Sequence, residues 1–183
     1  MRIIAGKYSS RRLETLPGQH TRPTLDKVKE AVFSSLGGFF DGGTVLDLYG
    51  GSGAIAFEAL SRGMDKAYIV DKSRAAIQVI RKNAELLDCQ SQCEIYPLND
   101  VKALTLLQEK GVQFDLVYLD PPYERQRNKQ ILAYLDEHDM VKPQGDVVIE
   151  SLKEEEYRDN YSHLVYRKEA VYGIMKITYY RHQ

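Results

Sequence analysis

The sequence predicts an α/β fold built on a mostly parallel sheet, and three observations lead to it. From residue 44 onward, short apolar runs alternate with longer amphipathic segments, which is the pattern of repeated βαβ units. Glycines close two of the amphipathic segments, at Gly63 and Gly111. The last run, residues 164–180, is expected to form two strands that turn near Gly173 and give the sheet an antiparallel edge.

Before residue 44 we expect a hairpin and one helix. Two short runs, residues 2–5 and 11–16, surround a polar turn and predict a β-hairpin. Residues 25–36 have helical periodicity, with Thr24 as the expected N-cap. The other expected helices are residues 54–62, 74–87, 101–110 and 126–138, and the expected strands before the final pair are residues 44–49, 66–71, 93–98, 114–120 and 145–150. We therefore expect a basic hairpin extension over residues 1–20 and one domain with a seven-stranded sheet over residues 21–183.

Composition is typical of a globular chain and argues against several functional classes. Hydrophobic residues make up 43% of the chain and charged residues 28%, which is ordinary for a domain with its own core. No apolar run approaches the roughly 18 to 20 residues of a membrane span. The first residues lack the apolar core of a secretory signal, so we expect a cytoplasmic protein. Cys89, Cys93 and the scattered histidines do not have metal-ligand spacing, and we expect no metal.

Charge is distributed unevenly, although the net charge is only −1. Residues 1–30 hold seven Lys or Arg and three Asp or Glu, a local charge of +4, which leaves −5 for the remainder. A basic arm on an acidic body can bind phosphate groups. A solvated charged face would give the same pattern. The basic residues on the expected hairpin are Lys7, Arg11 and Arg12.

Ligands of parallel α/β sheets bind beyond the carboxyl ends of the strands, and three of these ends carry informative residues. The first opens a glycine-rich turn that a ligand could approach closely, with the candidate residues Asp47, Tyr49, Gly51, Ser52 and Gly53. The second is Asp71, whose carboxylate can accept hydrogen bonds from ribose hydroxyls. The third is the pair Asn99-Asp100. Taken alone, Asp71 or Asp100 could equally be a helix N-cap.

Two cofactors compete for the glycine-rich turn. Residues 51–56, GSGAIA, match the dinucleotide pattern G-x-G-x-x-A, and Asp71 would also suit NAD. S-adenosylmethionine has a ribose too, but its amino-acid tail carries an ammonium group that needs a carboxylate nearby. Asp47 precedes the glycines and supplies such a carboxylate, which a dinucleotide does not require. The sequence therefore favours S-adenosylmethionine.

The fourth strand of the alternating region ends in LDPPYE, residues 119–124. Proline fixes φ and has no N–H, so this loop is stiff and offers two acceptors, the Asp120 carboxylate and the Pro121 carbonyl. Pro122 holds Pro121 extended, and Tyr123 adds a flat face for stacking. In the usual strand order of such sheets this loop faces the cofactor. A planar group that carries an NH₂ would suit it.

The loop predicts a particular kind of methyl transfer. The exocyclic amine of a base is a poor nucleophile because its lone pair is delocalised into the ring. Accepting both N–H bonds favours a pyramidal nitrogen, whose lone pair can attack a sulfonium methyl. Asp120 would also stabilise the positive charge that develops on nitrogen. The sequence leaves open whether the proton leaves to Asp120 or to water. Simple termination of a strand by the prolines is the alternative interpretation.

Three segments in the first third of the chain indicate which kind of methyltransferase the chain resembles: MRIIAGKYSSRRL, RPTLDKVKEAVFSSL and LDLYGGSGAIAFEALSRG. With Asp71 and DPPY they resemble the RsmD-type 16S ribosomal RNA guanine-N2 methyltransferases over nearly the whole chain. The resemblance implies a Rossmann-like class I methyltransferase fold, with S-adenosyl-L-methionine as cofactor and the N2 amine of a guanine as acceptor. It implies 16S rRNA or the 30S subunit as partner, with no membrane, and we expect a monomer.

The resemblance also implies roles for residues of the cofactor site. Gly51 and Gly53 would contact the methionine part, and Asp71 would hold the ribose. Asn99 or Asp100 would contact the adenine edge. This sequence has Asn-Asp where Asp-Ala or Asn-Ala is expected, so the adenine contact is assigned to the pair, with Asn99 as the aligned member.

On the substrate side, the resemblance implies that Asp120, Pro121 and Tyr123 hold the target base. Arg22 and Thr24 would border the active site, with Arg22 near an RNA phosphate. The basic residues of the expected hairpin would then contact RNA as well.

Three other functions share some of these features. An adenine-N6 DNA methyltransferase has the same acceptor motif, but it usually carries a target-recognition region for which this chain shows no insertion. A glutamine-N5 protein methyltransferase usually has a helical N-terminal domain and Asn at the position of Asp120. An NAD-binding oxidoreductase, or a non-catalytic nucleotide-binding module, would explain only the glycine-rich turn.

Overall fold

The computed structural model describes the backbone of residues 1–18 and 23–183, and the side chains of residues 1–18 and 25–183. The expected roles of Arg22 and of the Thr24 side chain lie outside these residues. The described chain forms two compact units, a first unit over Met1–Ala103 and a second over Leu104–Gln183. Each unit is considered by itself.

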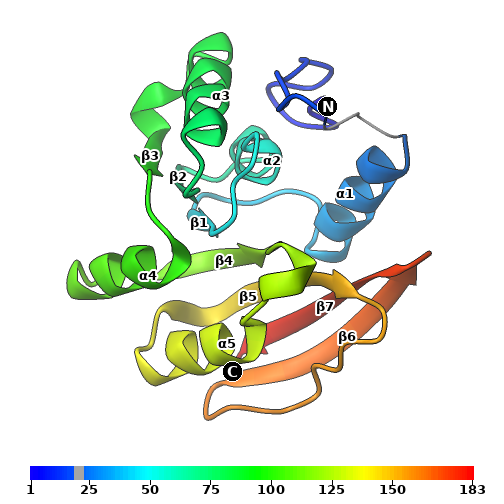
Figure 1. Ribbon diagram of the computed structural model, residues 1–183, viewed down its shortest axis with the longest axis vertical. Helices are drawn as coiled ribbons and strands as arrows, with labels where there is room; N and C mark the ends of the chain where they lie inside the picture. The colour runs from blue at the N-terminus through cyan, green and yellow to red at the C-terminus, as the bar shows by residue number, and fades with distance from the viewer. Residues whose placement is uncertain (19–22) are drawn as a thin grey trace. The chain divides into compact units, whose positions relative to one another are not determined.

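The first unit contains three parallel strands in the order β3-β2-β1. The strands are β1 (Thr44–Asp47), β2 (Lys66–Val70) and β3 (Cys93–Tyr96), and the helices are α1 (Pro23–Ser35), α2 (Ala54–Ser61), α3 (Arg74–Leu86) and the start of α4 (Asp100–Glu109). A short 3-10 turn, η1 (Gln90–Gln92), precedes β3. Figure 1 shows α2 and α3 beside the three strands. This βαβ arrangement leaves the carboxyl ends of the strands next to the loops that carry the candidate cofactor residues.

Residues 1–18 are attached to the first unit by a buried charge cluster. The Glu58 carboxylate on α2 is fully buried and accepts hydrogen bonds from the backbone N–H groups of Ile4 and Ala5, at 2.9 and 3.1 Å. Lys29 and Arg62 form ion pairs with the same carboxylate, at 3.2 and 2.8 Å. A buried carboxylate needs such partners. The cluster therefore fixes the N-terminal segment onto α2.

The N-terminal hairpin is shorter than the sequence predicts. Its two arms share one antiparallel bridge, between Arg2 and Arg12, and neither arm forms a regular strand. The backbone hydrogen bonds from Ile3 to Arg11 and from Leu13 to Met1, both 2.9 Å, continue the antiparallel pairing. The backbone N–H groups of Ile4 and Ala5 point to Glu58 instead of to the other arm, which explains why the ladder does not lengthen.

The second unit contains four strands in the order β4-β5-β7-β6. They are β4 (Phe114–Leu119), β5 (Val141–Leu152), β6 (Leu164–Tyr172) and β7 (Met175–His182), with the helix α5 (Asn128–Glu137) and the 3-10 turn η2 (Tyr123–Arg125). The β4–β5 pair is parallel, whereas β7 is antiparallel to both β5 and β6. The long β6–β7 pair is drawn in orange and red in Figure 1. This is the predicted antiparallel edge.

Most element boundaries differ by one or more residues from the sequence-based expectation, and two of the differences have a clear physical reason. Strand β5 begins at Val141 instead of residue 145, because a register shift against β4 lets it continue through Gln144, whose φ is 66°. Helix α1 begins at Pro23, so the expectation that Thr24 is its N-cap was wrong; proline suits the first helical position, since it has no N–H to satisfy. The described residues contain seven strands and five α-helices. Within them, the helices are all too short or too polar to cross a membrane.

Candidate cofactor loop and acceptor loop

The cofactor loop is the segment between β1 and α2, residues 48–53. Its turn is held by backbone hydrogen bonds of 2.7 Å, from Gly50 to Val70 and from Gly53 to Gly50. Gly53 has a φ of 84°, and a Cβ there would lie 2.4 Å from the Phe57 ring. Gly51 has a φ of 58°, and a Cβ there would meet nothing within 4 Å. The turn thus requires glycine at Gly53, whereas Gly51 presents bare backbone to open space.

Asp71, which directly follows β2, is bonded to the cofactor loop. Its Oδ2 atom accepts a hydrogen bond from the Gly51 N–H at 2.9 Å, and its Oδ1 atom accepts one from the Ser73 N–H at 2.8 Å. Ser73 is the N-cap of α3, since its hydroxyl oxygen accepts from the Ala76 N–H at 3.3 Å. Asp71 is therefore not the cap itself. Its half-buried carboxylate fixes the glycine turn relative to the start of α3.

Asp47 is a buried acid whose carboxylate is not fully hydrogen-bonded by the described residues. Its side chain is only 2% exposed, and its Oδ2 atom has no hydrogen-bond partner among the described residues. The pKa of Asp47 is raised to about 7: burial is the main cause, the backbone hydrogen bonds from Ala56 and Tyr49 oppose the shift, and the Asp71 charge adds to it. An ammonium group at this position would stabilise the ionised carboxylate. The site therefore fits the amino-acid tail of S-adenosylmethionine.

Asn99 and Asp100 have different surroundings. The Asn99 side-chain oxygen accepts a hydrogen bond from the Lys102 N–H at 2.9 Å, which makes Asn99 the cap of α4. The Tyr49 hydroxyl donates a hydrogen bond to Asp100 Oδ2 at 2.7 Å. The structure thus brings Asp100, but not the Asn99 side chain, into contact with a residue of the cofactor loop. Tyr49 and Asp100 are consistent with a place on the wall of an adenosine site.

The acceptor loop, residues 120–123, follows β4 in the second unit. Pro121 is buried, whereas Asp120 and Pro122 are exposed. Tyr123 is 42% exposed and begins the 3-10 turn η2. Burial raises the pKa of the Tyr123 hydroxyl, and the negative charges of Glu150 and Asp120 raise it further. Two carboxylates therefore act on the end of a ring that is available for stacking.

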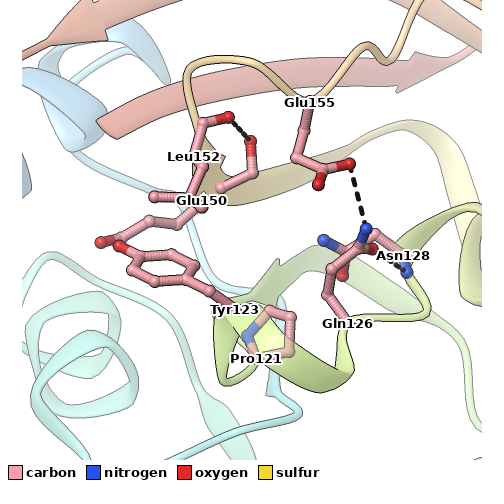
Figure 2. A pocket seen from close by; sticks show the side chains of 8 residues that line it. Pro121, Tyr123, Gln126, Asn128, Glu150, Leu152 and Glu155 are labelled. Atoms are coloured by element: carbon pink, nitrogen blue, oxygen red, sulfur yellow. Dashed lines mark hydrogen bonds between the residues drawn. The ribbon is translucent and has the colours of Figure 1, made fainter. Parts of the chain in front are cut away.

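A small recess lies beside this loop, and Figure 2 shows its lining. Its residues come from the acceptor loop, the segment that leads into α5, the end of β5 and the segment after it: Pro121, Tyr123, Gln126, Asn128, Glu150, Ser151, Leu152 and Glu155. It holds about 200 Å³ of empty space, part of which is open solvent. Glu150 was not among the residues predicted from the sequence. An acid that ends an apolar run, as in VVIE, was the available signal.

The basic residues of the N-terminal segment remain exposed, although two of them contact the first unit. The Lys7 ammonium donates a hydrogen bond to Gln92 Oε1 at 3.1 Å and lies 4.8 Å from the Tyr8 ring centroid. The Arg11 guanidinium donates to the Leu86 carbonyl. Arg12 is exposed. No group of three or more His, Cys, Asp or Glu placed to hold a metal ion occurs among the described residues.

Comparison with solved structures defines the class of the fold. The structure described as "Putative methyltransferase yhhF from Escherichia coli" superposes with a TM-score of 0.84 and 28% sequence identity, covering 100% of this chain and 98% of that one. The match includes both units and the N-terminal segment. The fold is therefore the Rossmann-like class I methyltransferase fold, as the sequence predicts, with a mixed sheet of seven strands.

Comparison of sequences then identifies the family. The model of the family described as "Conserved hypothetical protein 95" matches residues 1–181, and the chain belongs to this family. "Putative rRNA methyltransferase YlbH" of Bacillus subtilis is 36% identical over 181 residues, covering 99% of this chain and 98% of the relative. "Ribosomal RNA small subunit methyltransferase D" of Haemophilus influenzae is 34% identical over 155 residues, covering 84% and 80%. The expected resemblance to RsmD-type enzymes is confirmed.

Proposed function

We propose that this protein transfers a methyl group from S-adenosyl-L-methionine to the exocyclic N2 amine of a guanine in 16S ribosomal RNA. The observation that carries the proposal is the acceptor loop: a rigid Asp-Pro-Pro-Tyr turn that offers acceptors and a stacking ring, in a chain with the methyltransferase fold. The relative from Haemophilus influenzae, named as a methyltransferase of small-subunit ribosomal RNA, supports the choice of RNA.

The cofactor loop would bind S-adenosyl-L-methionine through its backbone and its acids. Asp47 would receive the ammonium group, because its buried Oδ2 atom lacks a partner among the described residues. Gly51 would allow close approach of the methionine part, and Asp71 would accept ribose hydroxyls with lone pairs not used by Gly51 and Ser73. When bound, the cofactor supplies an electrophilic methyl on a sulfonium. A solved methyltransferase with the same fold is described as complexed with SAH, the demethylated product of this cofactor.

The acceptor loop would make the guanine amine nucleophilic. Tyr123 stacks on the base, while the Asp120 carboxylate and the Pro121 carbonyl accept its two N–H bonds. These two hydrogen bonds would favour a pyramidal nitrogen, whose lone pair would then be free to accept the methyl group that the bound cofactor supplies. Positive charge on the nitrogen is stabilised by Asp120 until one proton leaves. Orientation of the two reactants contributes much of the rate.

The exposed basic residues of the N-terminal segment would bind the RNA backbone. Lys7, Arg11 and Arg12 lie on one short segment of the first unit, and phosphate binding by such residues is independent of base sequence. We assign the substrate to 16S rRNA or the 30S particle, and we expect the protein to act as a monomer.

A transfer assay tests this function. Labelled S-adenosyl-L-methionine is incubated with the protein and with 30S particles or 16S rRNA from a strain that lacks the enzyme, and the RNA is digested to nucleosides. We expect label in N2-methylguanosine. Label in N6-methyladenosine or in protein, with none in N2-methylguanosine, would refute the acceptor. Binding of NAD without binding of S-adenosyl-L-methionine in calorimetry would refute the cofactor.

A further inference from the structure

Glu150 is an acid beside the acceptor loop to which the proposed chemistry gives no role. It lies near the end of β5, opposite Ile177 of β7, and its side chain lines the recess together with Tyr123. Figure 2 shows the carboxyl end of Glu150 and the hydroxyl end of Tyr123 on the same side of this recess. The influence of the Glu150 charge on the Tyr123 hydroxyl, larger than that of Asp120, agrees with this proximity.

One oxygen of this carboxylate is committed within the protein and the other is not. The Tyr118 hydroxyl donates a hydrogen bond to Glu150 Oε2 at 3.1 Å. Oε1 accepts no hydrogen bond from the described residues. Burial raises the pKa of Glu150, and the Tyr118 bond opposes the shift. A partly desolvated acceptor that is held in place distinguishes strongly between a ligand that donates to it and one that does not.

The wall opposite Glu150 is rigid, which fixes the shape of the recess. The Asn128 amide is fully buried and donates a hydrogen bond to the Tyr157 hydroxyl at 3.1 Å. The Tyr157 hydroxyl donates to Gln126 Oε1 at 3.2 Å, and Gln126 Nε2 donates to Glu155 Oε2 at 3.1 Å. The donors of these polar groups are occupied with one another, whereas the buried Asn128 Oδ1 atom accepts no hydrogen bond from the described residues. Glu150 Oε1 is the acceptor of the recess that lies beside the Tyr123 ring and is left for a ligand.

The edges of the bases differ at the atom next to the reacting amine. Guanine has an N1–H beside its 2-amine, so this edge is a row of donors. Adenine has an unprotonated N1 beside its 6-amine, and a carboxylate would meet a lone pair there. A single acceptor at this point thus separates the two bases, whereas the Asp120-Pro121 acceptors suit either amine.

We propose that Glu150 determines the base specificity of this enzyme: its carboxylate accepts the N1–H of the target guanine while the base stacks on Tyr123. The inference rests on the proposed guanine-N2 function and adds to it the residue that selects guanine. Asp120 and Pro121 then bind the 2-amine, and Glu150 binds the neighbouring position on the same edge. The bond from Tyr118 positions the carboxylate.

The test compares guanine with 2,6-diaminopurine, which keeps the 2-amine but has no N1–H. Particles are reconstituted with either base at the methylated position of 16S rRNA, and kcat/KM is measured for each. We expect the wild-type protein to favour guanine by about 30-fold or more, the effect of one hydrogen bond to a charged acceptor. Glu150→Gln keeps an acceptor for Tyr118 and adds an N–H for the diaminopurine N1, so the preference should fall to about threefold or less. Glu154→Gln, which alters an exposed carboxylate of the next turn, should keep the wild-type preference.

The outcomes separate this inference from the function on which it rests. Methylation of both bases by the wild-type protein within about threefold overturns the role of Glu150 and leaves the guanine-N2 activity intact. An unchanged preference in Glu150→Gln overturns it too. Failure of the wild-type protein to form N2-methylguanosine overturns both. Because the wild-type ratio needs no variant, the test stands even where Glu150→Gln does not fold.

Discussion

The cofactor loop and the acceptor loop both follow strands, but they are built in opposite ways. In the cofactor loop the backbone is bare at Gly51, and its N–H groups are used in hydrogen bonds to Asp71 and within the turn. In the acceptor loop two prolines remove the N–H groups, and Asp120 and Tyr123 are exposed. Cofactor binding by the first loop depends on the open space at Gly51 and on the buried carboxylate of Asp47. The second depends on side chains that solvent already reaches, so substitutions there should alter rate without altering the fold.

The largest effect that would test this contrast comes from Asp120→Ala. We expect methyl transfer to fall by about 10³-fold, because an electrostatic and hydrogen-bonding partner of the reacting amine is lost. Cofactor affinity and thermal stability should stay close to those of the wild type, since Asp120 is exposed. The measurements are the labelled transfer assay and calorimetry, with Glu124→Ala as a control at the exposed acid that directly follows the loop. A parallel collapse of cofactor binding would assign Asp120 to the cofactor site.

A second test uses two glycines with matched backbone. Gly51 and Gly173 have φ values of 58° and 65°, and at both a Cβ would meet nothing within 4 Å. Alanine at either should cost about 1–2 kcal/mol of unfolding free energy. Only Gly51→Ala should also lower cofactor affinity, by about 30-fold, because its methyl group enters the space that we assign to the methionine part. Thermal unfolding and calorimetry measure the two effects. Equal cofactor affinity in both variants would contradict the assignment.

The contrast also explains how much the sequence predicts. Local patterns predict the strands, the helices and both loops because each depends on neighbouring residues: an apolar run, a glycine pair, two prolines. The N-terminal hairpin was only partly predictable. Its ladder is interrupted by Glu58, which is more than 50 residues away in the chain and captures the N–H groups of Ile4 and Ala5. No local sequence pattern shows that Glu58 competes with the second arm of the hairpin for these N–H groups.

The same limit applies to the candidate site. The sequence identifies Asp47 and Asp71 as acids at strand ends. It does not show that Asp47 is desolvated, with one oxygen that lacks a partner among the described residues, or that Asp71 accepts hydrogen bonds from two backbone N–H groups. The role of Tyr49 as a donor to Asp100 spans 51 residues. Glu150 was missed because its significance comes from Tyr118 and Tyr123, which lie on a different strand and loop. Burial and long-range pairing are properties of the fold.

A third prediction uses the shifted pKa of Asp47. The pKa is about 7 in the folded protein, against 3.8 for an unperturbed aspartate, so the cofactor-free protein binds this proton more tightly when folded. Stability should therefore fall as pH rises from about 4 to about 7. Cofactor affinity should change in the opposite sense, rising by about tenfold per pH unit up to about 7, because the ammonium group requires the ionised carboxylate. Calorimetry and thermal unfolding between about pH 5.5 and 7.5 measure both trends.

Asp47→Asn is the matched control for these pH effects. It keeps the size of the side chain but cannot ionise, so both slopes should flatten, and cofactor affinity should be low throughout the range. The variant should be at least as stable as the wild type at pH values above about 7, where ionised Asp47 is buried without a full set of partners. A slope in cofactor affinity that persists in Asp47→Asn would show that another group controls the pH dependence.

The smallest predicted effect concerns the exposed basic residues of the N-terminal segment, Lys7, Arg11 and Arg12. Arg12 is the most suitable of them for a substitution. Lys7 and Arg11 each donate a hydrogen bond to the first unit, so their removal would also disturb the protein. The Arg12 side chain is exposed and makes no hydrogen bond or ion pair with the described residues. Arg12→Gln should weaken RNA binding by about threefold, lower the slope of log K against log salt by about 1, and leave cofactor affinity unchanged.

Lys153→Gln is the control for this last effect, because it removes an exposed positive charge from the second unit. If phosphate binding follows the N-terminal segment, the salt slope should change in Arg12→Gln and not in Lys153→Gln. Equal changes in the two variants would mean that RNA responds only to the net charge of the protein. In that case the local charge of +4 over residues 1–30 would be a solvated face, and recognition of RNA would depend on the acceptor loop and the recess beside it.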